Sequence, residues 1–212
     1  MPVCDDPKLQ ERVNRIGQMV ADCSPLSDIP WRFVVVRHNV PNAACCGEGS
    51  VFVTTGLLDL GVSDDELAGA LGHEVAHGVR RHVFRRYDLV MELRILLNDY
   101  QRLSKEVQEA SKITPSLRAR VDEYTRRRDL LQNQIDRDIF YSQVDEEEAD
   151  VLGLRYSTAA GFRADGLGDC LSKLDRYAVA QFGTGVTQSD MSHPPVKRRL
   201  EILQLARSRN HI

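Results

Sequence analysis

The sequence has no long apolar run. None of its 212 residues belongs to a stretch of 18 consecutive apolar side chains, so we expect no transmembrane segment. The formal net charge is only −3, and it lacks the positive excess of a typical nucleic-acid-binding domain, so we expect no nucleic-acid partner. The opening residues Met1–Asp6 contain neither the basic nor the apolar part of a secretory leader. The sequence predicts a soluble chain, cytoplasmic as written, or periplasmic or membrane-peripheral if a leader was trimmed.

The cysteines lack the regular spacing of a disulfide framework. Their number, five, is odd, so at least one is not in an intramolecular disulfide, which favours a reducing compartment. Hydrophobic residues make up 42 % of the chain, enough for a core. We therefore expect one folded domain over residues 1–212.

The residue patterns predict an α+β fold with a small sheet. Helical spacing of apolar residues marks a helix from about Pro7 to Cys23. Trp31–Arg37 and Ser50–Thr54 are rich in β-branched and aromatic residues and predict strands, with a loop over Asn39–Gly49 between them. Two further helices are expected near the C-terminus, over about 164–181 and 195–209.

A helical hairpin is predicted at about residues 85–141. From Leu89 to Ala110 the apolar residues recur in alternating steps of four and three, which is typical of a coiled-coil seam. Thr114-Pro115 interrupts the helix, and the seam resumes at Leu117. Many charged side chains along both halves exclude a membrane-spanning hairpin.

Residues 71–78 read Leu-Gly-His-Glu-Val-Ala-His-Gly, an HExxH motif. A helix places His73 and His77 on one face, where both imidazoles can bind one Zn²⁺. Glu74 then lies beside the remaining coordination position, where it can take a proton as water attacks a carbonyl. Ser63 and Glu66 form a capping-box pattern that predicts where this helix begins.

A catalytic zinc site normally has a third protein ligand, and several residues are candidates. They are His38, His82, His193 and the acidic run Asp145–Asp150. On two predicted helical faces, small residues surround the polar ones. One face has Gly69, Ala70, His73, Ala76 and His77, and the other has Glu146, Ala149, Asp150 and Gly153. Two such faces can pack closely and direct Glu146 at the histidines, with Asp150 accepting a hydrogen bond from a ligand imidazole. The alternative is a solvated acidic patch.

Taken together, HEVAH and EEEAD resemble the gluzincin metallopeptidases of the HtpX and CAAX-prenyl-protease (Ste) type, here as a soluble minimal form. Three further stretches carry the resemblance: Asn42-Ala43 with Ser50–Leu58, Asp65–Glu74, and Ser192–Pro195 with Arg199. The resemblance implies a mainly helical zincin domain that binds one Zn²⁺ per chain through His73, His77 and Glu146. It also implies that Glu74 is the general base and that Asp150 lies behind the ligands. The acidic run then has Glu146, rather than Glu147 or Glu148, at the metal.

The resemblance also suggests roles around the cleft. Ser50, Val51, Phe52, Val53 and Thr54 would form its edge strand, to which an extended substrate adds by main-chain hydrogen bonds. His193 is a candidate oxyanion stabiliser or resting-state zinc ligand, and otherwise a loop histidine without a role. Arg199 is a candidate transition-state or structural residue, and otherwise a surface charge. Cys45 and Cys46 depart from the family pattern, which more often has apolar residues, Pro and Gly there. A thiolate near zinc could inhibit the site or make it redox-sensitive, and the alternative is two small buried side chains.

These features predict a zinc metalloendopeptidase that hydrolyses unfolded or extended protein segments. The alternative is a non-catalytic module in which zinc stabilises the fold and the hairpin binds a partner. In either case the hairpin is a candidate for self-association, for a partner or for peripheral contact with anionic lipid. A charged helix pair that is simply solvated is the remaining alternative.

Overall fold

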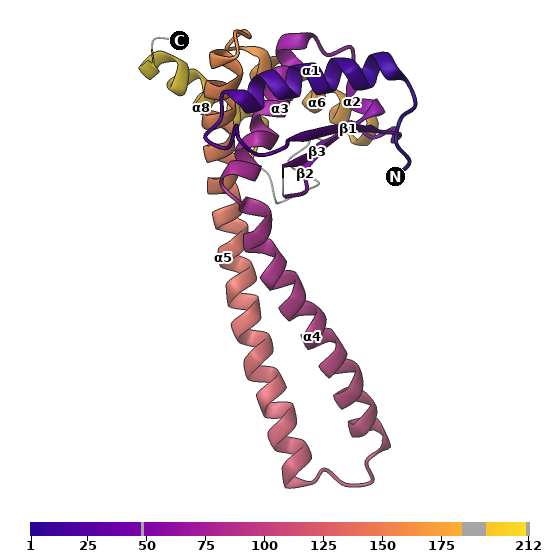
Figure 1. The fold of residues 1–212 in the computed structure, drawn as a ribbon. Coiled ribbons are helices and arrows are strands. Elements are labelled where there is room, and N and C mark those ends of the chain that lie inside the picture. The colour runs from indigo at the N-terminus through magenta and orange to yellow at the C-terminus, as the bar shows by residue number, and fades with distance from the viewer. Residues whose placement is uncertain (48, 184–193, 211–212) are drawn as a thin grey trace. The chain divides into compact units, whose positions relative to one another are not determined.

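The computed structural model describes residues 1–47, 49–183 and 194–210, and their side chains except at 83, 85–90, 135–142 and 209–210. It divides into two compact units, Met1–Val83 with Ser142–Ile212, and Phe84–Tyr141. The larger unit contains a sheet and most of the helices (Figure 1). In the described part of the chain, no helix combines the length and the apolar character that a membrane crossing requires.

The sheet has three strands, β1 (Arg32–Val36), β2 (Ala43–Cys45) and β3 (Ser50–Thr54). β3 lies in the middle, parallel to β1 and antiparallel to β2. The predicted strands are both present, but the prediction that Ser50–Thr54 is the edge strand is wrong, because both its sides are hydrogen-bonded. The short strand β2 lies within the segment that was predicted as a loop. Three residues are too few to show a strand periodicity in the sequence, so β2 could not be seen there.

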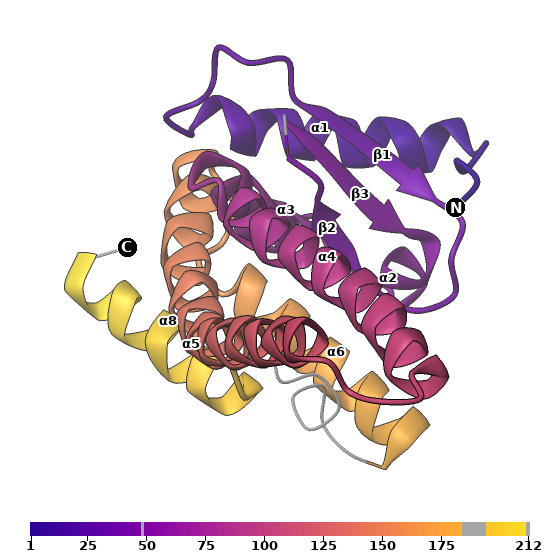
Figure 2. The ribbon, with the colours of Figure 1, turned by 90° about the horizontal axis from the view of Figure 1, so that it is seen from below.

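Helix α1 (Pro7–Asp22) covers part of the sheet. Its buried side chains Val13, Ile16 and Val20 belong to one core cluster with residues of all three strands. Figure 2 shows α1 running along β1 and β3. A short helix α2 (Thr55–Asp59) follows β3. Buried residues of α2, of α3 (Asp64–Val79) and of two later helices also belong to this cluster.

Helix α3 begins as its sequence predicts. The Ser63 hydroxyl accepts from the backbone N–H of Glu66, and the Glu66 carboxylate accepts from the N–H of Ser63. Lys173 also binds this carboxylate, at 2.8 Å. Both ends of the capping box are therefore occupied, and the first turn of the helix is held in place.

The remaining helices of the larger unit form a second core cluster. Helix α6 (Gly166–Phe182), helix α8 (Val196–Asn210) and the end of α5 (Pro115–Ala159) contribute its buried residues. These residues are Leu154, Leu167, Leu171, Val196, Leu203 and Ala206. The two C-terminal helices thus lie close to the predicted ranges.

Glycines set the spacing of α3 from its neighbours. A Cβ atom on Gly72 would lie 2.6 Å from the carbonyl oxygen of Gly153 on α5, and one on Gly153 would lie 2.5 Å from the backbone nitrogen of His73. Gly69 does not meet α5; it faces Leu167 of α6, where a Cβ would lie 2.3 Å from the backbone nitrogen. The predicted close packing of small-residue faces is present, but α3 uses Gly72 for α5 and Gly69 for α6.

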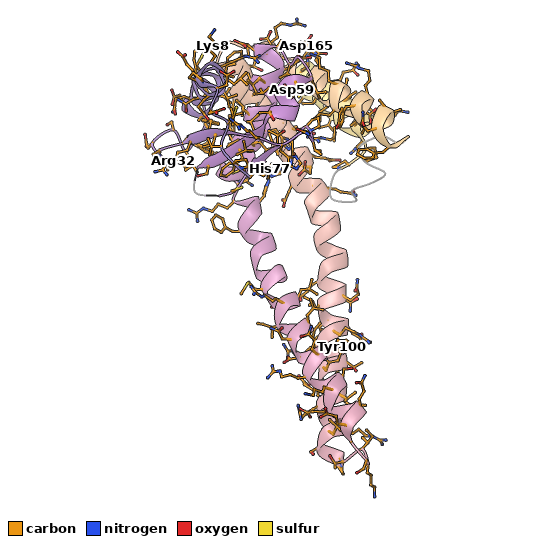
Figure 3. All side chains as sticks on the ribbon, turned by 90° about the vertical axis from the view of Figure 1, so that its right-hand side faces the viewer. Lys8, Arg32, Asp59, His77, Tyr100 and Asp165 are labelled. Atoms are coloured by element: carbon orange, nitrogen blue, oxygen red, sulfur yellow. The ribbon has the colours of Figure 1, made fainter. Side chains whose placement is uncertain are left out.

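The smaller unit consists of two long helical segments, from α4 (His82–Glu109) and α5, joined by residues 110–114. Pro115 is the first residue of α5, which agrees with the predicted break. Arg120 binds Glu106 at 2.6 Å, Arg127 binds Asp99 at 2.8 Å, and the ring of Tyr100 lies against that of Tyr124 (Figure 3). Leu96, Leu117 and Leu131 are buried, whereas Leu93 and Val107 of the predicted seam remain exposed.

The contact between α3 and α5 predicts the effect of adding one methyl group. Gly153→Ala forces the backbones apart, and we expect the free energy of unfolding to fall by about 1–3 kcal/mol in urea titrations. The matched control is Gly168→Ala in α6, where a Cβ would meet only the flexible end of Leu200, at 3.3 Å. Because alanine is the better helix former, the control should be neutral or stabilising. Equal effects of the two substitutions would show that α3 and α5 tolerate a wider spacing.

Candidate metal centre

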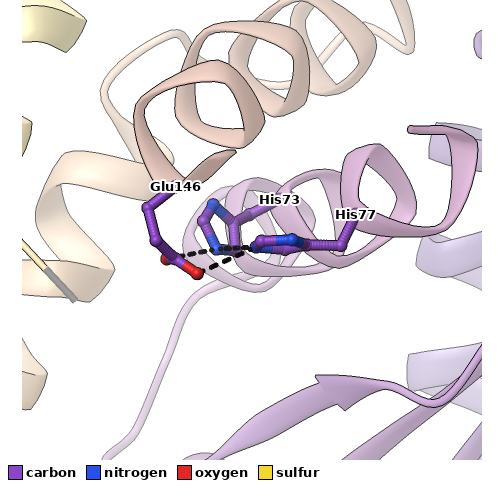
Figure 4. A group of neighbouring side chains, drawn as sticks. All are labelled: His73, His77 and Glu146. Atoms are coloured by element: carbon purple, nitrogen blue, oxygen red, sulfur yellow. Dashed lines mark hydrogen bonds and ion pairs between the residues drawn. The ribbon is translucent and has the colours of Figure 1, made fainter. Parts of the chain in front are cut away.

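Two imidazoles from α3 form the centre of the site. His73 and His77 lie one helical turn apart on one face, and both are buried. Their Nε2 atoms are 3.0 Å apart, so the two rings direct the same kind of nitrogen toward a common point (Figure 4).

Glu146 from α5 completes this group. Its Oε2 lies 3.2 Å from Nε2 of His73, and its Oε1 lies 3.2 Å from Nε2 of His77. The carboxylate is buried, and Figure 4 shows it facing both rings. Ligand atoms about 2.0–2.2 Å from a tetrahedral zinc ion lie roughly 3.3 Å from each other. The three side chains thus have nearly the separations that such an ion requires.

The other glutamates of the acidic run turn elsewhere. Glu147 binds Arg198 at 3.0 Å, and Glu148 binds Arg80 at 2.9 Å. Among Glu146, Glu147 and Glu148, the structure places only Glu146 with the two histidines. This is the register that the resemblance implied.

Asp150, one turn after Glu146, lies behind His73. Its Oδ1 is 2.9 Å from Nδ1 of His73, and the Arg199 guanidinium binds both of its oxygens, at 2.6 and 2.8 Å. Burial opposes ionisation of Asp150, but Arg199 and His73 outweigh it and lower the pKa of this carboxyl group. Arg199 is itself buried, so the alternative that it is a surface charge is wrong.

Carboxylates determine the protonation of His73 in the metal-free protein. Burial lowers its pKa, but the hydrogen bonds to Asp150 and Glu146 outweigh this and raise the pKa to about 10. The two neighbouring carboxylates therefore stabilise a positive charge on His73.

Glu74 connects the histidine helix to the sheet. Its Oε2 accepts a hydrogen bond of 2.8 Å from the backbone N–H of Cys45 in β2. The side chain is half-buried, next in sequence to His73. The strand that touches the predicted general base is thus β2, which the sequence did not show.

His82, which the sequence offered only as an alternative third ligand, lies on the other side of His77. Its Nδ1 is 2.9 Å from Nδ1 of His77, and its Nε2 is 3.2 Å from Glu148 and 3.4 Å from Asp145. His38, another candidate, is exposed after β1. The predicted role of His193 falls on a residue outside the described part of the chain.

The two cysteines beside Glu74, Cys45 and Cys46, have thiols whose protonated form is favoured. Burial is the main cause that raises the pKa of Cys45, to about 11, and burial also raises the pKa of Cys46. All five cysteines are free. Cys45 is buried, which favours its interpretation as a small apolar side chain. Cys46 is exposed, so the alternative of two buried side chains is wrong for Cys46.

The Arg199–Asp150 pair predicts a large difference between adjacent arginines. Arg199→Ala leaves a buried carboxylate uncompensated, and we expect a loss of about 3–5 kcal/mol in the free energy of unfolding. The matched control is Arg198→Ala, which removes only the more exposed contact with Glu147 and should cost about 0–1 kcal/mol. Denaturant titration of both variants measures the difference, and similar losses would contradict a structural role for Arg199.

Comparison with known proteins adds named relatives. The mitochondrial metalloendopeptidase OMA1 of Arabidopsis thaliana is 41 % identical over 81 residues, which is 38 % of this chain and 17 % of the relative. A putative beta-barrel assembly-enhancing protease of Vibrio cholerae is 26 % identical over 182 residues, 84 % of this chain and 36 % of the relative. The Escherichia coli beta-barrel assembly-enhancing protease is 23 % identical over 202 residues, 94 % of this chain and 39 % of the relative.

The matched parts thus make up between 17 and 39 % of the length of these relatives. All three relatives carry the names of proteases. The model of peptidase family M48 matches residues 7–206, all but the first six and the last six residues. The chain therefore belongs to peptidase family M48.

Proposed function

We propose that the chain is a zinc-dependent metalloendopeptidase whose ligands are His73, His77 and Glu146. The observation that carries the proposal is the convergence of two Nε2 atoms and one carboxylate at separations of 3.0–3.2 Å. Two imidazoles and a glutamate are a ligand set of catalytic zinc sites. A gluzincin domain over residues 1–212, with a helical hairpin inserted at about 85–141, accommodates this site.

The charges of the surrounding side chains fit a divalent cation. Glu74, Glu146 and Asp150 are within electrostatic reach of one guanidinium, that of Arg199. With neutral imidazoles, this group has two excess negative charges, which Zn²⁺ balances. Of the residues that the structure describes, no further His, Cys, Asp or Glu joins the three ligands.

Each side chain then has a definite task in peptide hydrolysis. His73, His77 and Glu146 would hold a zinc ion, which would supply Lewis acidity to water and to the scissile carbonyl. Glu74 accepts the proton of the attacking water and delivers it to the departing amine nitrogen. The Asp150 carboxylate accepts a hydrogen bond from Nδ1–H of His73 and so keeps Nε2 available for the metal, while Arg199 holds Asp150 in its ionised form.

Strand β2 supplies the edge for an extended substrate. In an antiparallel ladder the backbone groups of alternate residues face away from the paired strand. The Cys45 N–H faces away from β3, because it donates to Glu74. Ala43, two residues earlier, directs its backbone groups to the same side. A peptide that pairs with this edge would lie beside Glu74 and be read through its main chain. The proposed substrates are therefore unfolded or extended protein segments.

The proposal is tested by a substitution that removes the general base and leaves the three metal ligands unchanged. Glu74→Gln should reduce cleavage of unfolded casein by at least about 10²-fold, because the amide cannot accept the proton. It should still bind one zinc ion per chain by metal analysis and unfold at the wild-type temperature. The matched control is Glu11→Gln on the exposed side of α1, which should cleave like the wild type. Cleavage by Glu74→Gln at the wild-type rate would contradict the mechanism, and a wild-type protein without zinc would contradict the whole proposal.

A further inference from the structure

His82 makes different contacts at its two ring nitrogens. It is only 2 % exposed. Its Nδ1 faces another nitrogen, Nδ1 of His77, at 2.9 Å. Its Nε2 faces carboxylate oxygens, those of Glu148 at 3.2 Å and Asp145 at 3.4 Å.

These contacts determine where the protons are. A carboxylate only accepts hydrogen bonds, so Nε2 of His82 is the nitrogen that carries a proton. Nδ1 of the neutral ring is then an acceptor, and the 2.9 Å contact requires His77 to donate from its own Nδ1. With its proton at Nδ1, His77 has a free lone pair at Nε2, the atom that faces His73 and Glu146.

We propose that His82 is a positioning residue for His77, linking that ligand through a second imidazole to the carboxylates of Asp145 and Glu148. The proposal rests on the proposed zinc site. With this role for His82, each ligand imidazole has a hydrogen-bond partner at Nδ1 that fixes the orientation of the ring and its tautomer. For His73 the partner is Asp150 directly, and for His77 it is the relay through His82.

An energetically unfavourable turn between α3 and α4 places His82 next to His77. Each residue of a helix advances by about 100°, so a residue five positions after His77 would lie about 140° away from it around α3. Instead α3 ends at Val79, and Arg81 adopts φ +56°, which costs a residue other than glycine about 1–2 kcal/mol. This left-handed residue ends α3 and brings His82, the first residue of α4, back onto His77.

The same side chains offer another chemistry. One ligand atom each of His82, Asp145 and Glu148 lies within 4.8 Å of the others, which would also suit a second metal ion. Arg80, however, already binds Glu148 at 2.9 Å, and a guanidinium next to this carboxylate disfavours a cation. The contact with His77 is explained by the relay and not by a second metal. We therefore treat a second metal as an outcome of the test.

The experiment is a zinc competition titration against a chromogenic chelator. His82→Phe keeps a ring of similar size but no hydrogen bonds, and we expect a loss of about 10–100-fold in zinc affinity. His82→Gln offers an acceptor and a donor and should recover most of this loss. Arg81→Gly is the matched control: glycine adopts φ +56° without strain, so the turn and the wild-type affinity should persist.

The other possible outcomes of this titration each decide against the role of His82 or against the zinc site. Wild-type affinity in His82→Phe, with one zinc per chain, overturns the relay and leaves the zinc site intact. Two zinc ions in the wild type and one in His82→Phe would make this cluster a second metal site instead. A wild type without zinc removes the proposed function and the relay together. If His82→Phe does not fold, Asp145→Ala/Glu148→Ala replaces it, and unchanged zinc affinity in that variant overturns the relay.

Discussion

The close approach of α3 and α5 at Gly72 and Gly153 is the constraint on which the site depends. A methyl group on either glycine would lie 2.5–2.6 Å from backbone atoms of the other helix. Gly72 immediately precedes His73, and Glu146 lies two turns before Gly153 on α5. The distance between the two backbones therefore sets the distance between imidazoles and carboxylate. A wider spacing would leave the three ligand atoms too far apart for one ion.

Around this contact, the buried polar groups are arranged in pairs that compensate each other. Asp150 forms an ion pair with Arg199 and also contacts His73, while Glu74 accepts a hydrogen bond from the backbone of β2. These groups are costly to bury alone, and each is stabilised by its neighbour. The remaining excess of negative charge is what a divalent ion would neutralise. Fold stability and the proposed metal binding would thus depend on the same side chains.

Local features of the sequence predicted much of this arrangement. The capping box at Ser63, the four-residue spacing of His73 and His77, and the break at Thr114-Pro115 depend on neighbouring residues alone. Other features depend on packing and could not be predicted. Strand β2 forms only by pairing with β3. The sequence does not distinguish Gly69 from Gly72, so it cannot show which of them faces α5 and which faces α6. The position of His82 depends on the backbone conformation of Arg81. The sequence also made Arg199 either a surface charge or a functional residue, because its partner is 49 positions away.

The most direct test of the zinc site is anomalous X-ray diffraction at the zinc absorption edge, from crystals of the chain with one equivalent of zinc. We predict a single strong peak about 2.0–2.2 Å from Nε2 of His73, Nε2 of His77 and a carboxylate oxygen of Glu146. A peak bound instead by His82, Asp145 and Glu148, or no peak beside His73 and His77, would contradict it.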